Sequence, residues 1–342
     1  MADKTYQKNC GSYYEKENAF DWLQILINHF EPYRIKIPKV LDDIDRPLWS
    51  VIIPTYNCAN YLKETLSSVL AQDPREEVME IIVVDDHSTK DDPETVVKEY
   101  GQGHVQFIRQ EKNVGKVKNY ETGLTASRGR YIHQLHGDDL VYDGFYSEME
   151  TLFNESPSAA AGFCRTNYID SQSRVTGVTG MIQNKEGIVP DMLEKLYTQQ
   201  YIQTPSMVVK REVYESVGCF DRRLNCMEDW EMWIRIANNY PIATSNKVLA
   251  AYRSHQDNAT NSTFKNGTAL KTHQLICDLV DGYIEPNIKK NFSKIRNQKQ
   301  AEFWLLSYKN SKHELSLKEK WSFVIKILKL DFNLKNSYRI FS

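Results

Sequence analysis

The sequence predicts an α/β fold in which a mainly parallel sheet is covered by helices on both faces. Short β-branched runs alternate with amphipathic segments from Trp49 onward, which is typical of strands alternating with helices. The links between them are short, as they are in strand–helix–strand units. The runs end in the polar stretches PTYN, DDHS and HGDD. Because ligands bind at the carboxyl ends of the strands in such sheets, these three ends predict one site.

Each element follows from its local pattern. The runs SVIIP, EIIVVDD, VQFIRQ and RYIHQLHGDD predict strands, and the segments between them predict the helices YLKETLSSVLAQ, PETVVKEYG and GKVKNYETGLTAS. The second half is more mixed, with helices predicted at GFYSEMETLF and EDWEMWIRIANNY, a strand at AAAGFCRTNYID, and a strand followed by a helix at SMVVKREVYESVG. In EDWEMWIRIANNY, Trp230 and Trp233 are expected in the core rather than as sugar platforms. After about residue 265 the pattern is helical.

These patterns predict three regions. Residues 1–46 form an appendage with a short amphipathic helix at ENAFDWLQILINHF, residues 47–262 form the α/β domain, and residues 263–342 form a helical region. From Lys289 onward this last region has thirteen Lys or Arg residues against four Asp or Glu. A basic amphipathic tail suits peripheral contact with an anionic membrane. It suits equally well a helical flap that packs on the domain with a solvated basic face.

The overall composition is that of an ordinary soluble protein. The 342 residues have a net charge of −2, with 41% hydrophobic and 26% charged residues, so we expect no nucleic-acid partner. No run approaches 18 apolar residues, and the first residues lack the apolar stretch of a secretory signal. The six cysteines have no metal-ligand spacing, which predicts free thiols in a reducing compartment. We therefore expect a cytoplasmic protein.

Six segments carry a resemblance to a known family. In chain order they are SVIIPTYNCANYLKETLSSVLAQ, EIIVVDDHS, NVGKVKNYETGLTASRGRYIHQLHGDDL, VGCFDRRL, MEDWEMWIRIA and YRSH. Over roughly residues 48–257 the chain resembles family 2 of the inverting glycosyltransferases, which have the GT-A fold. The resemblance implies transfer of a sugar from a nucleotide diphosphate, with a UDP-sugar as the expected donor. No Q-x-x-R-W follows the predicted helix at 228–240, which favours transfer of a single sugar over processive synthesis.

The donor needs a platform for its base and positive charge for its diphosphate. The first strand end supplies the platform candidates Pro54, Thr55, Tyr56 and Asn57. The resemblance implies donor contacts for Pro54, Tyr56 and Asp86, with Asp86 accepting a hydrogen bond from a uracil N–H. Asp85 is a secondary candidate, because the first carboxylate of such a pair often braces its turn. The candidates for the diphosphate are Lys116 and Arg253.

A divalent cation would neutralise the charge of the departing diphosphate, and oxygen ligands suit Mn²⁺ or Mg²⁺. The family usually has Asp-x-Asp-Asp where this chain has His136, Gly137, Asp138 and Asp139. The resemblance implies that Asp138 binds the metal, and that His255 in YRSH binds the metal or the diphosphate. His136 replaces the first carboxylate, and with Gly137 it is a candidate for donor binding. Its imidazole is expected to contact the ribose of the donor or the metal, and it fits Mn²⁺ better than Mg²⁺.

Inversion by direct displacement needs a carboxylate that removes the proton from the acceptor hydroxyl. Glu228 and Asp229 open a predicted helix, whose N-terminus favours the charged carboxylate. The resemblance implies that Asp229 is the base, with Glu228 near sugar or acceptor hydroxyls. The alternative is that Asp229 is an ordinary helix cap.

The expected product is part of a bacterial surface glycan, made at the inner face of the cell membrane on a glycan or lipid-linked glycan acceptor. Two other functions compete with this one. His136, at the position of the first carboxylate, is consistent with a non-catalytic subunit that only binds a nucleotide sugar. A nucleotidyltransferase would need a Gly-rich basic phosphate loop near its first strand, and SVIIPTYN is not one.

Overall fold

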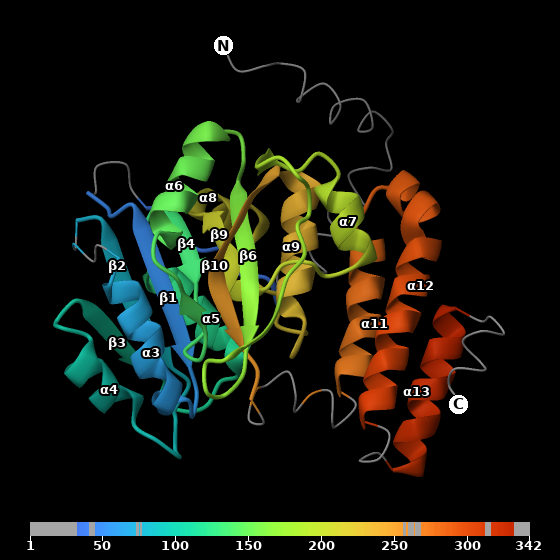
Figure 1. The fold of residues 1–342 in the computed structure, drawn as a ribbon, viewed down its shortest axis with the longest axis horizontal. Coiled ribbons are helices and arrows are strands. Elements are labelled where there is room, and N and C mark those ends of the chain that lie inside the picture. Colours follow the sequence, from blue (N-terminus) through green and yellow to red (C-terminus); the bar gives the residue numbers. More distant parts are fainter. Residues whose placement is uncertain are drawn as a thin grey trace.

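The computed structural model describes residues 33–40, 45–72, 75, 77–255, 258, 263, 268–311 and 316–331. The helix predicted at ENAFDWLQILINHF lies outside these residues. One continuous sheet with helices packed on it makes up most of the molecule, and a group of helices from the end of the chain lies beside it (Figure 1). The fold is α/β, as predicted.

The first half of the sheet is parallel, in the order β3-β2-β1-β4. Its strands are β1 (Trp49–Thr55), β2 (Met79–Asp85), β3 (Val105–Arg109) and β4 (Tyr131–Gln134), and its helices are α3 (Ala59–Leu70), α4 (Pro93–Tyr100) and α5 (Lys116–Ala126). Every residue of β1 is buried, which its apolar β-branched run leads one to expect. Val51 packs with Leu66 of α3, whereas Ile52 packs with Leu124 of α5, so helices cover both faces.

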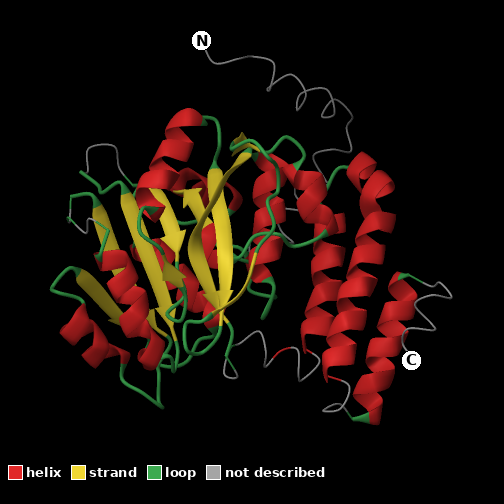
Figure 2. Ribbon diagram, viewed as in Figure 1, coloured by secondary structure: helices red, strands yellow, loops and turns green. Residues whose placement is uncertain are grey.

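The second half of the sheet is mixed. Strand β9 (Met207–Lys210) pairs antiparallel with both β4 and β6 (Ala161–Ile169), and β6 pairs parallel with β10 (Ile242–Arg253). The shorter strands are β5 (Leu140–Val141), β7 (Val175–Val178) and β8 (Gly187–Ile188), and the helices are α6 (Phe145–Glu155), α7 (Met192–Thr198), the 3₁₀ turn η2 (Thr204–Ser206), α8 (Arg211–Val217) and α9 (Glu228–Asn239). Strands and helices are distinguished by colour in Figure 2.

Strand β10 was not predicted from the sequence. A polar stretch from Thr244 to Lys247 interrupts its apolar pattern, and its register with β6 shifts between Thr244 and Ala250. The strand forms nevertheless because β6 and β5 pair with it on either side. It matters for function because it ends at Arg253, within the YRSH segment and two residues before His255.

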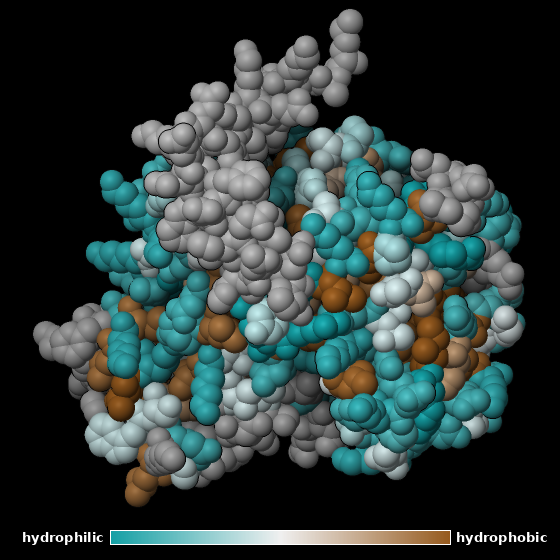
Figure 3. Space-filling model, turned by 180° about the vertical axis from the view of Figure 1, so that it is seen from behind, coloured by the Kyte–Doolittle hydropathy of each residue, from teal (hydrophilic) through white to brown (hydrophobic). Residues whose placement is uncertain are grey.

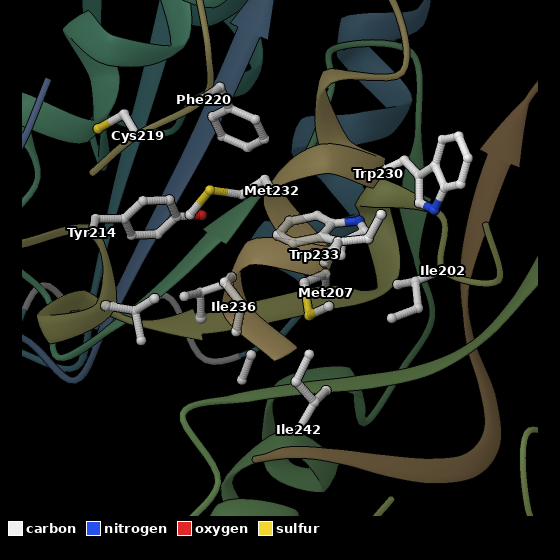
Figure 4. Close-up of a cluster of buried hydrophobic side chains, with 14 of the residues drawn as sticks. Ile202, Met207, Tyr214, Cys219, Phe220, Trp230, Met232, Trp233, Ile236 and Ile242 are labelled. Atoms are coloured by element: carbon white, nitrogen blue, oxygen red, sulfur yellow. The ribbon is translucent and has the colours of Figure 1, made fainter. Parts of the chain in front are cut away.

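Helix α9 packs deep in the larger of the cores. Trp230, Trp233 and Ile236 are buried there with Phe220 and Tyr214 (Figure 4). The indole N–H of Trp230 donates to Leu196 O at 2.8 Å. The two tryptophans are therefore core residues, as predicted, and they hold the start of α9 in place.

Among the described residues from 268 to 331, most are helical, as predicted, in α11 (Thr268–Asp281), α12 (Pro286–Ser311) and α13 (Leu317–Leu330). Helix α11 joins the larger core through Ile276, while Trp304 of α12 packs against Phe323 and Ile327 of α13. Within the described residues, no helix is long and apolar enough to cross a membrane. Apolar side chains remain among polar ones on the surface of these helices, as the rear view shows (Figure 3).

Residues 33–40 lie against the α/β domain. The buried Arg34 donates to Asp221 at 2.8 Å and lies 3.0 Å from Glu231 of α9. Ile35 O accepts from Cys219 N, and Ile37 belongs to the larger core. This part of the predicted appendage is thus packed onto the domain.

Candidate active site

The three polar strand ends meet at one edge of the sheet, as the parallel arrangement predicts. The end of β1 contacts the end of β4 because Pro54 O accepts from Gly137 N at 3.0 Å. A Cβ on Gly137 would lie 3.1 Å from both Cys58 Sγ and Thr55 Oγ1, so a side chain here would crowd this contact. Two further elements complete the site: the end of β10 and the first turn of α9.

Strand β10 places His255 beside Asp138. His255 Nε2 lies 3.0 Å from Asp138 Oδ2, although 117 residues separate them. The Tyr61 ring of α3 lies against the His255 imidazole, with ring centres 4.7 Å apart. The structure therefore brings together the two residues that the sequence predicted as metal ligands.

The residues after β4 suit a divalent cation. One ligand atom from each of His136, Asp138 and Asp139 lies within 4.8 Å of the others. Asp139 Oδ2 is buried and has no hydrogen-bond partner among the described residues, and burial together with the Asp138 charge raises the pKa of Asp139 well above its usual value. A bound cation would give Asp139 Oδ2 a partner and offset the repulsion between the Asp138 and Asp139 charges. Mixed nitrogen and oxygen donors fit Mn²⁺ better than Mg²⁺.

His136 stacks on Tyr120 of α5, with ring centres 5.4 Å apart and planes 20° apart. Its Nδ1 lies 3.9 Å from Asp139 Oδ2, and its Nε2 lies 3.3 Å from the side-chain amide of Gln134. Burial lowers the pKa of His136, although the Asp138 and Glu228 charges act in the opposite direction. A neutral imidazole retains a lone pair, which a metal ligand needs.

Arg253 is placed differently from the prediction that it pairs with a phosphate. Its side chain is fully buried and donates to Asp138 O and Ser173 Oγ, both at 2.8 Å, and to Glu64 at 2.9 Å. Its backbone N–H donates to Asp139 Oδ1 at 2.9 Å. Arg253 therefore braces the backbone of Asp138 and the carboxylate of Asp139. Its guanidinium donors already have partners within the protein.

The polar residues at the ends of β1 and β2 mainly shape the loops. Asn57 Oδ1 accepts from the backbone N–H groups of Thr89 and Lys90, which ties one strand end to the next. Asp85 is fully buried and accepts from Ser88 and Arg109, so it braces its turn. That is the alternative role foreseen for it.

Asp86 was predicted to accept from the donor base, and in this structure its carboxylate holds the loop before α5. It is buried and accepts from the N–H groups of Val114 at 2.7 Å and Gly115 at 3.0 Å. Tyr56, in contrast, is 48% exposed at the end of β1, where its ring is available to a flat ligand.

Asp229 lies in the first turn of α9, one residue after the helix begins. Its Oδ1 accepts from Trp230 N at 2.8 Å, and its Oδ2 accepts from Gln200 Nε2 at 3.1 Å and Thr204 Oγ1 at 3.2 Å. The N-cap position belongs to Met227, so Asp229 is not the N-cap residue, although it accepts from one N–H of the first turn. Burial and the neighbouring Glu228 raise the pKa of Asp229 to about 6, while Lys116 acts against this rise.

Glu228 is buried beside Asp229 and pairs with the first residue of α5. Lys116 Nζ lies 2.7 Å from Glu228 Oε2, and the Tyr120 hydroxyl lies 3.3 Å from Glu228 Oε1. These contacts connect Lys116, the residue predicted to bind the diphosphate, to Glu228, which precedes the predicted general base Asp229.

Three residues of the site were not predicted individually. Tyr120 lies within the apolar pattern of α5, and Gln200 and Thr204 lie in a polar stretch without a motif. The signal for Gln200 and Thr204 in the sequence is that the stretch TQQYIQT follows a helix and is rich in side-chain donors. Which of these donors faces Asp229 depends on how the chain folds back onto α9.

The chain is similar to known glycosyltransferases. Residues 50–218 match the family Glycosyl transferase family 2. The chain is 29% identical over 219 residues to an uncharacterized glycosyltransferase of Rickettsia typhi, covering 63% of this chain and 67% of that protein. It is 40% identical over 108 residues to the poly(ribitol-phosphate) beta-N-acetylglucosaminyltransferase TarP of Staphylococcus aureus, covering 31% of this chain and 32% of TarP.

Solved structures share the fold. The crystal structure of S. aureus TarS 1-349 in complex with UDP-GlcNAc matches with a TM-score of 0.63 and 18% identity, over 82% of this chain and 80% of that one. The mannosyltransferase PcManGT from Pyrobaculum calidifontis, in complex with GDP-Man and Mn²⁺, matches with a TM-score of 0.50 and 16% identity, over 94% of this chain and 90% of that one. The chain therefore has a GT-A fold, and its residues 50–218 are similar to glycosyltransferase family 2.

Proposed function

We propose that this protein is a metal-dependent, inverting glycosyltransferase that moves one sugar from a UDP-sugar to an acceptor hydroxyl. The observation that carries the proposal is that Tyr120 joins the two groups of candidate residues: it stacks on His136 beside Asp138, and its hydroxyl lies 3.3 Å from Glu228, the neighbour of Asp229. UDP-GlcNAc is the first donor to test, since TarS was crystallised with it and TarP is named for transfer of N-acetylglucosamine. The acceptor class that we propose is a bacterial surface glycan, including polyol-phosphate polymers and lipid-linked glycans.

The residues that would hold the cation are Asp138, His136 and Asp139, together with His255, which lies 3.0 Å from Asp138. Mn²⁺ or Mg²⁺ bound there would neutralise the negative charge of the diphosphate as it leaves. The chain itself supplies Lys116 for the diphosphate and the exposed Tyr56 ring for the base.

Asp229 would act as the general base. Its carboxylate would take the proton of the acceptor hydroxyl while that oxygen bonds to the anomeric carbon and the bond from this carbon to the diphosphate breaks. The new bond forms on the face opposite the leaving group, which inverts the anomeric centre. A pKa of about 6 leaves Asp229 ionised at neutral pH and still basic enough to accept a proton.

The test is release of UDP from UDP-GlcNAc in the presence of Mn²⁺, with other nucleotide sugars as a panel. We expect turnover that chelation abolishes, and a fall of about 10³-fold in Asp138→Ala and in Asp229→Asn. Wild-type turnover in both variants would contradict the assigned roles. Tight, metal-independent binding of UDP-GlcNAc without any turnover would instead favour a non-catalytic binding subunit, the alternative that His136 suggests.

We also propose that the outer face of α13 makes a peripheral contact with an anionic membrane. Leu317, Trp321 and Ile325 are exposed at a spacing of four residues, and they are 76%, 60% and 50% exposed. Phe323 on the opposite face packs on α12, so α13 is also the packed flap considered as the alternative. Trp321→Gln should weaken sedimentation with phosphatidylglycerol vesicles, and wild-type protein that stays in solution at low salt would contradict this proposal.

A further inference from the structure

The segment between α7 and β9 supplies the side-chain donors that hold Asp229. This segment is called the holding segment below and is defined as residues 198–206, from the last residue of α7 to the residue before β9. Gln200 Nε2 and Thr204 Oγ1 both donate to Asp229 Oδ2, at 3.1 and 3.2 Å. Residues 199–203 between α7 and η2 have no helix or strand of their own. Their position therefore depends on what contacts them from outside.

Helix α12 holds the first end of the holding segment. Lys299 Nζ lies 2.7 Å from Tyr201 Oη and 3.5 Å from Thr198 Oγ1. The neighbouring Gln300 donates its side-chain amide to Thr198 O at 3.4 Å. Lys299 and Gln300 lie beyond residue 218. A helix outside the region that matches family 2 therefore contacts the segment that holds Asp229.

A second set of contacts holds α12 against α7. Arg296 Nη1 lies 2.6 Å from Asp281 Oδ1, and its guanidinium lies over the Tyr197 ring at 4.6 Å. The Tyr197 hydroxyl donates to the same Asp281 carboxylate at 2.9 Å. Helices α7, α11 and α12 are thereby joined next to the holding segment.

His133 of β4 holds the other end. Its Nε2 lies 3.0 Å from Pro205 O, and its Nδ1 lies 3.0 Å from the Tyr146 hydroxyl. Burial lowers the pKa of His133 to about 4, so the ring is neutral near pH 7 and has one N–H. Because a carbonyl oxygen can only accept, this N–H is on Nε2 and the Tyr146 hydroxyl donates to Nδ1. The residue after Thr204 is thus fixed to the sheet.

We propose that Lys299, Gln300 and His133 are positioning residues, which hold the holding segment so that Gln200 and Thr204 orient and stabilise the Asp229 carboxylate. This inference rests on the proposed role of Asp229 as the base. It assigns the C-terminal helices a part in the active site, in addition to packing.

The charged and hydrogen-bonding groups that face Asp229 set its pKa, which a titration can measure. Glu228 raises the pKa of Asp229, whereas Lys116, the Trp230 N–H and the Thr204 hydroxyl lower it. Each hydrogen bond donated to the carboxylate favours its charged form. Loss of such a donor, or displacement of the segment that carries it, should therefore raise the pKa of Asp229. A variant that merely loosens packing elsewhere would leave this pKa unchanged.

The experiment is a ¹³C NMR titration of the full chain labelled at its aspartate carboxyl groups, in which the resonance absent from Asp229→Asn identifies Asp229. Thr204→Val and Gln200→Leu each remove one donor and should raise its pKa by about 0.5 to 1. Lys299→Met should also raise the pKa of Asp229. It should lower the kcat for UDP-GlcNAc turnover about 3- to 10-fold, with KM for the donor unchanged. Lys290→Met, an exposed lysine on the same helix, is the matched control and should alter neither value.

Tyr201→Phe removes the partner of Lys299 with little change in volume, so it tests the anchor if Lys299→Met does not fold. An Asp229 pKa equal to that of wild type in Tyr201→Phe and in a folded Lys299→Met would overturn the role of α12. Because the titration does not depend on catalysis, it stays informative if Asp229→Asn keeps its turnover. That result would contradict the proposed base and leave the positioning contacts to be judged by NMR.

Discussion

Lys116 Nζ lies 2.7 Å from Glu228 Oε2, so an ion pair joins the first residue of α5 to the first residue of α9. Helix α5 follows the loop that Asp86 holds, and α9 carries Asp229. The pair therefore links the proposed diphosphate side of the site to the proposed base. A donor diphosphate that attracts Lys116 would also change the charge around Asp229.

Lys116→Met should weaken UDP binding about tenfold, because a cation near the diphosphate is lost. It should also raise the pKa of Asp229, since the Lys116 charge lowers that pKa in the wild type. Calorimetry with UDP measures the first effect. Lys118→Met, exposed on the same helix, is the control, and equal UDP affinity in both variants would exclude a role for Lys116 in donor binding.

Asp229→Asn should lower turnover about 10³-fold and at the same time stabilise the fold at neutral pH. A carboxyl whose pKa is raised to about 6 favours the folded state when protonated, so its charge costs stability above that pH. We expect the Tm at pH 8 to rise by about 2 to 4 °C. The difference should disappear below pH 4, where the carboxyl is protonated in both the folded and the unfolded chain. A lower Tm at pH 8 would show that the hydrogen bonds outweigh the burial of charge.

The pH dependence of catalysis should report the same group. A base must be ionised to accept a proton, so kcat/KM for the donor should rise tenfold per pH unit up to about 6 and then level off. The rate of UDP release between pH 4.5 and 8 measures this. An acidic limb near pH 4, the ordinary value for an aspartate, would contradict a base whose pKa is raised.

His255→Ala should raise the Mn²⁺ concentration needed for half-maximal turnover by about 10- to 100-fold, because Asp138 loses the imidazole that lies 3.0 Å away. Turnover at saturating Mn²⁺ should recover at least in part. Metal titration of the chelator-treated enzyme gives both values. An unchanged half-maximal concentration would assign His255 to the donor or to packing against Tyr61.

His136→Asp should shift the metal preference from Mn²⁺ toward Mg²⁺, since it replaces a nitrogen donor with an oxygen donor beside Asp138 and Asp139. The ratio of turnover with the two ions is the measurement. The same ratio in wild type and variant would place His136 outside the metal shell, where its stacking on Tyr120 would be its main role.

The fold of the first half follows from local patterns in the sequence. The runs around Val51 and Ile82 are buried on both sides, which parallel strands between helix layers require, and the polar residues after them therefore converge at one edge. Asp138 and Asp229 were predicted as site residues because each lies in a motif that resembles family 2 and at a strand end or a helix start. The GT-A fold follows for the same reason, and the structural comparison confirms it.

Tertiary structure decided how the side chains are used. Strand β10 has no clear pattern of its own and forms because β6 and β5 pair with it, yet it places His255 beside Asp138 and buries Arg253 behind the site. The holding segment and its anchor on α12 likewise have no motif. A sequence by itself determines which residues carry donors, acceptors and charge, and which local structure they favour. Which donor meets which acceptor depends on long-range packing, because burial and hydrogen-bond partners arise only when distant segments come together.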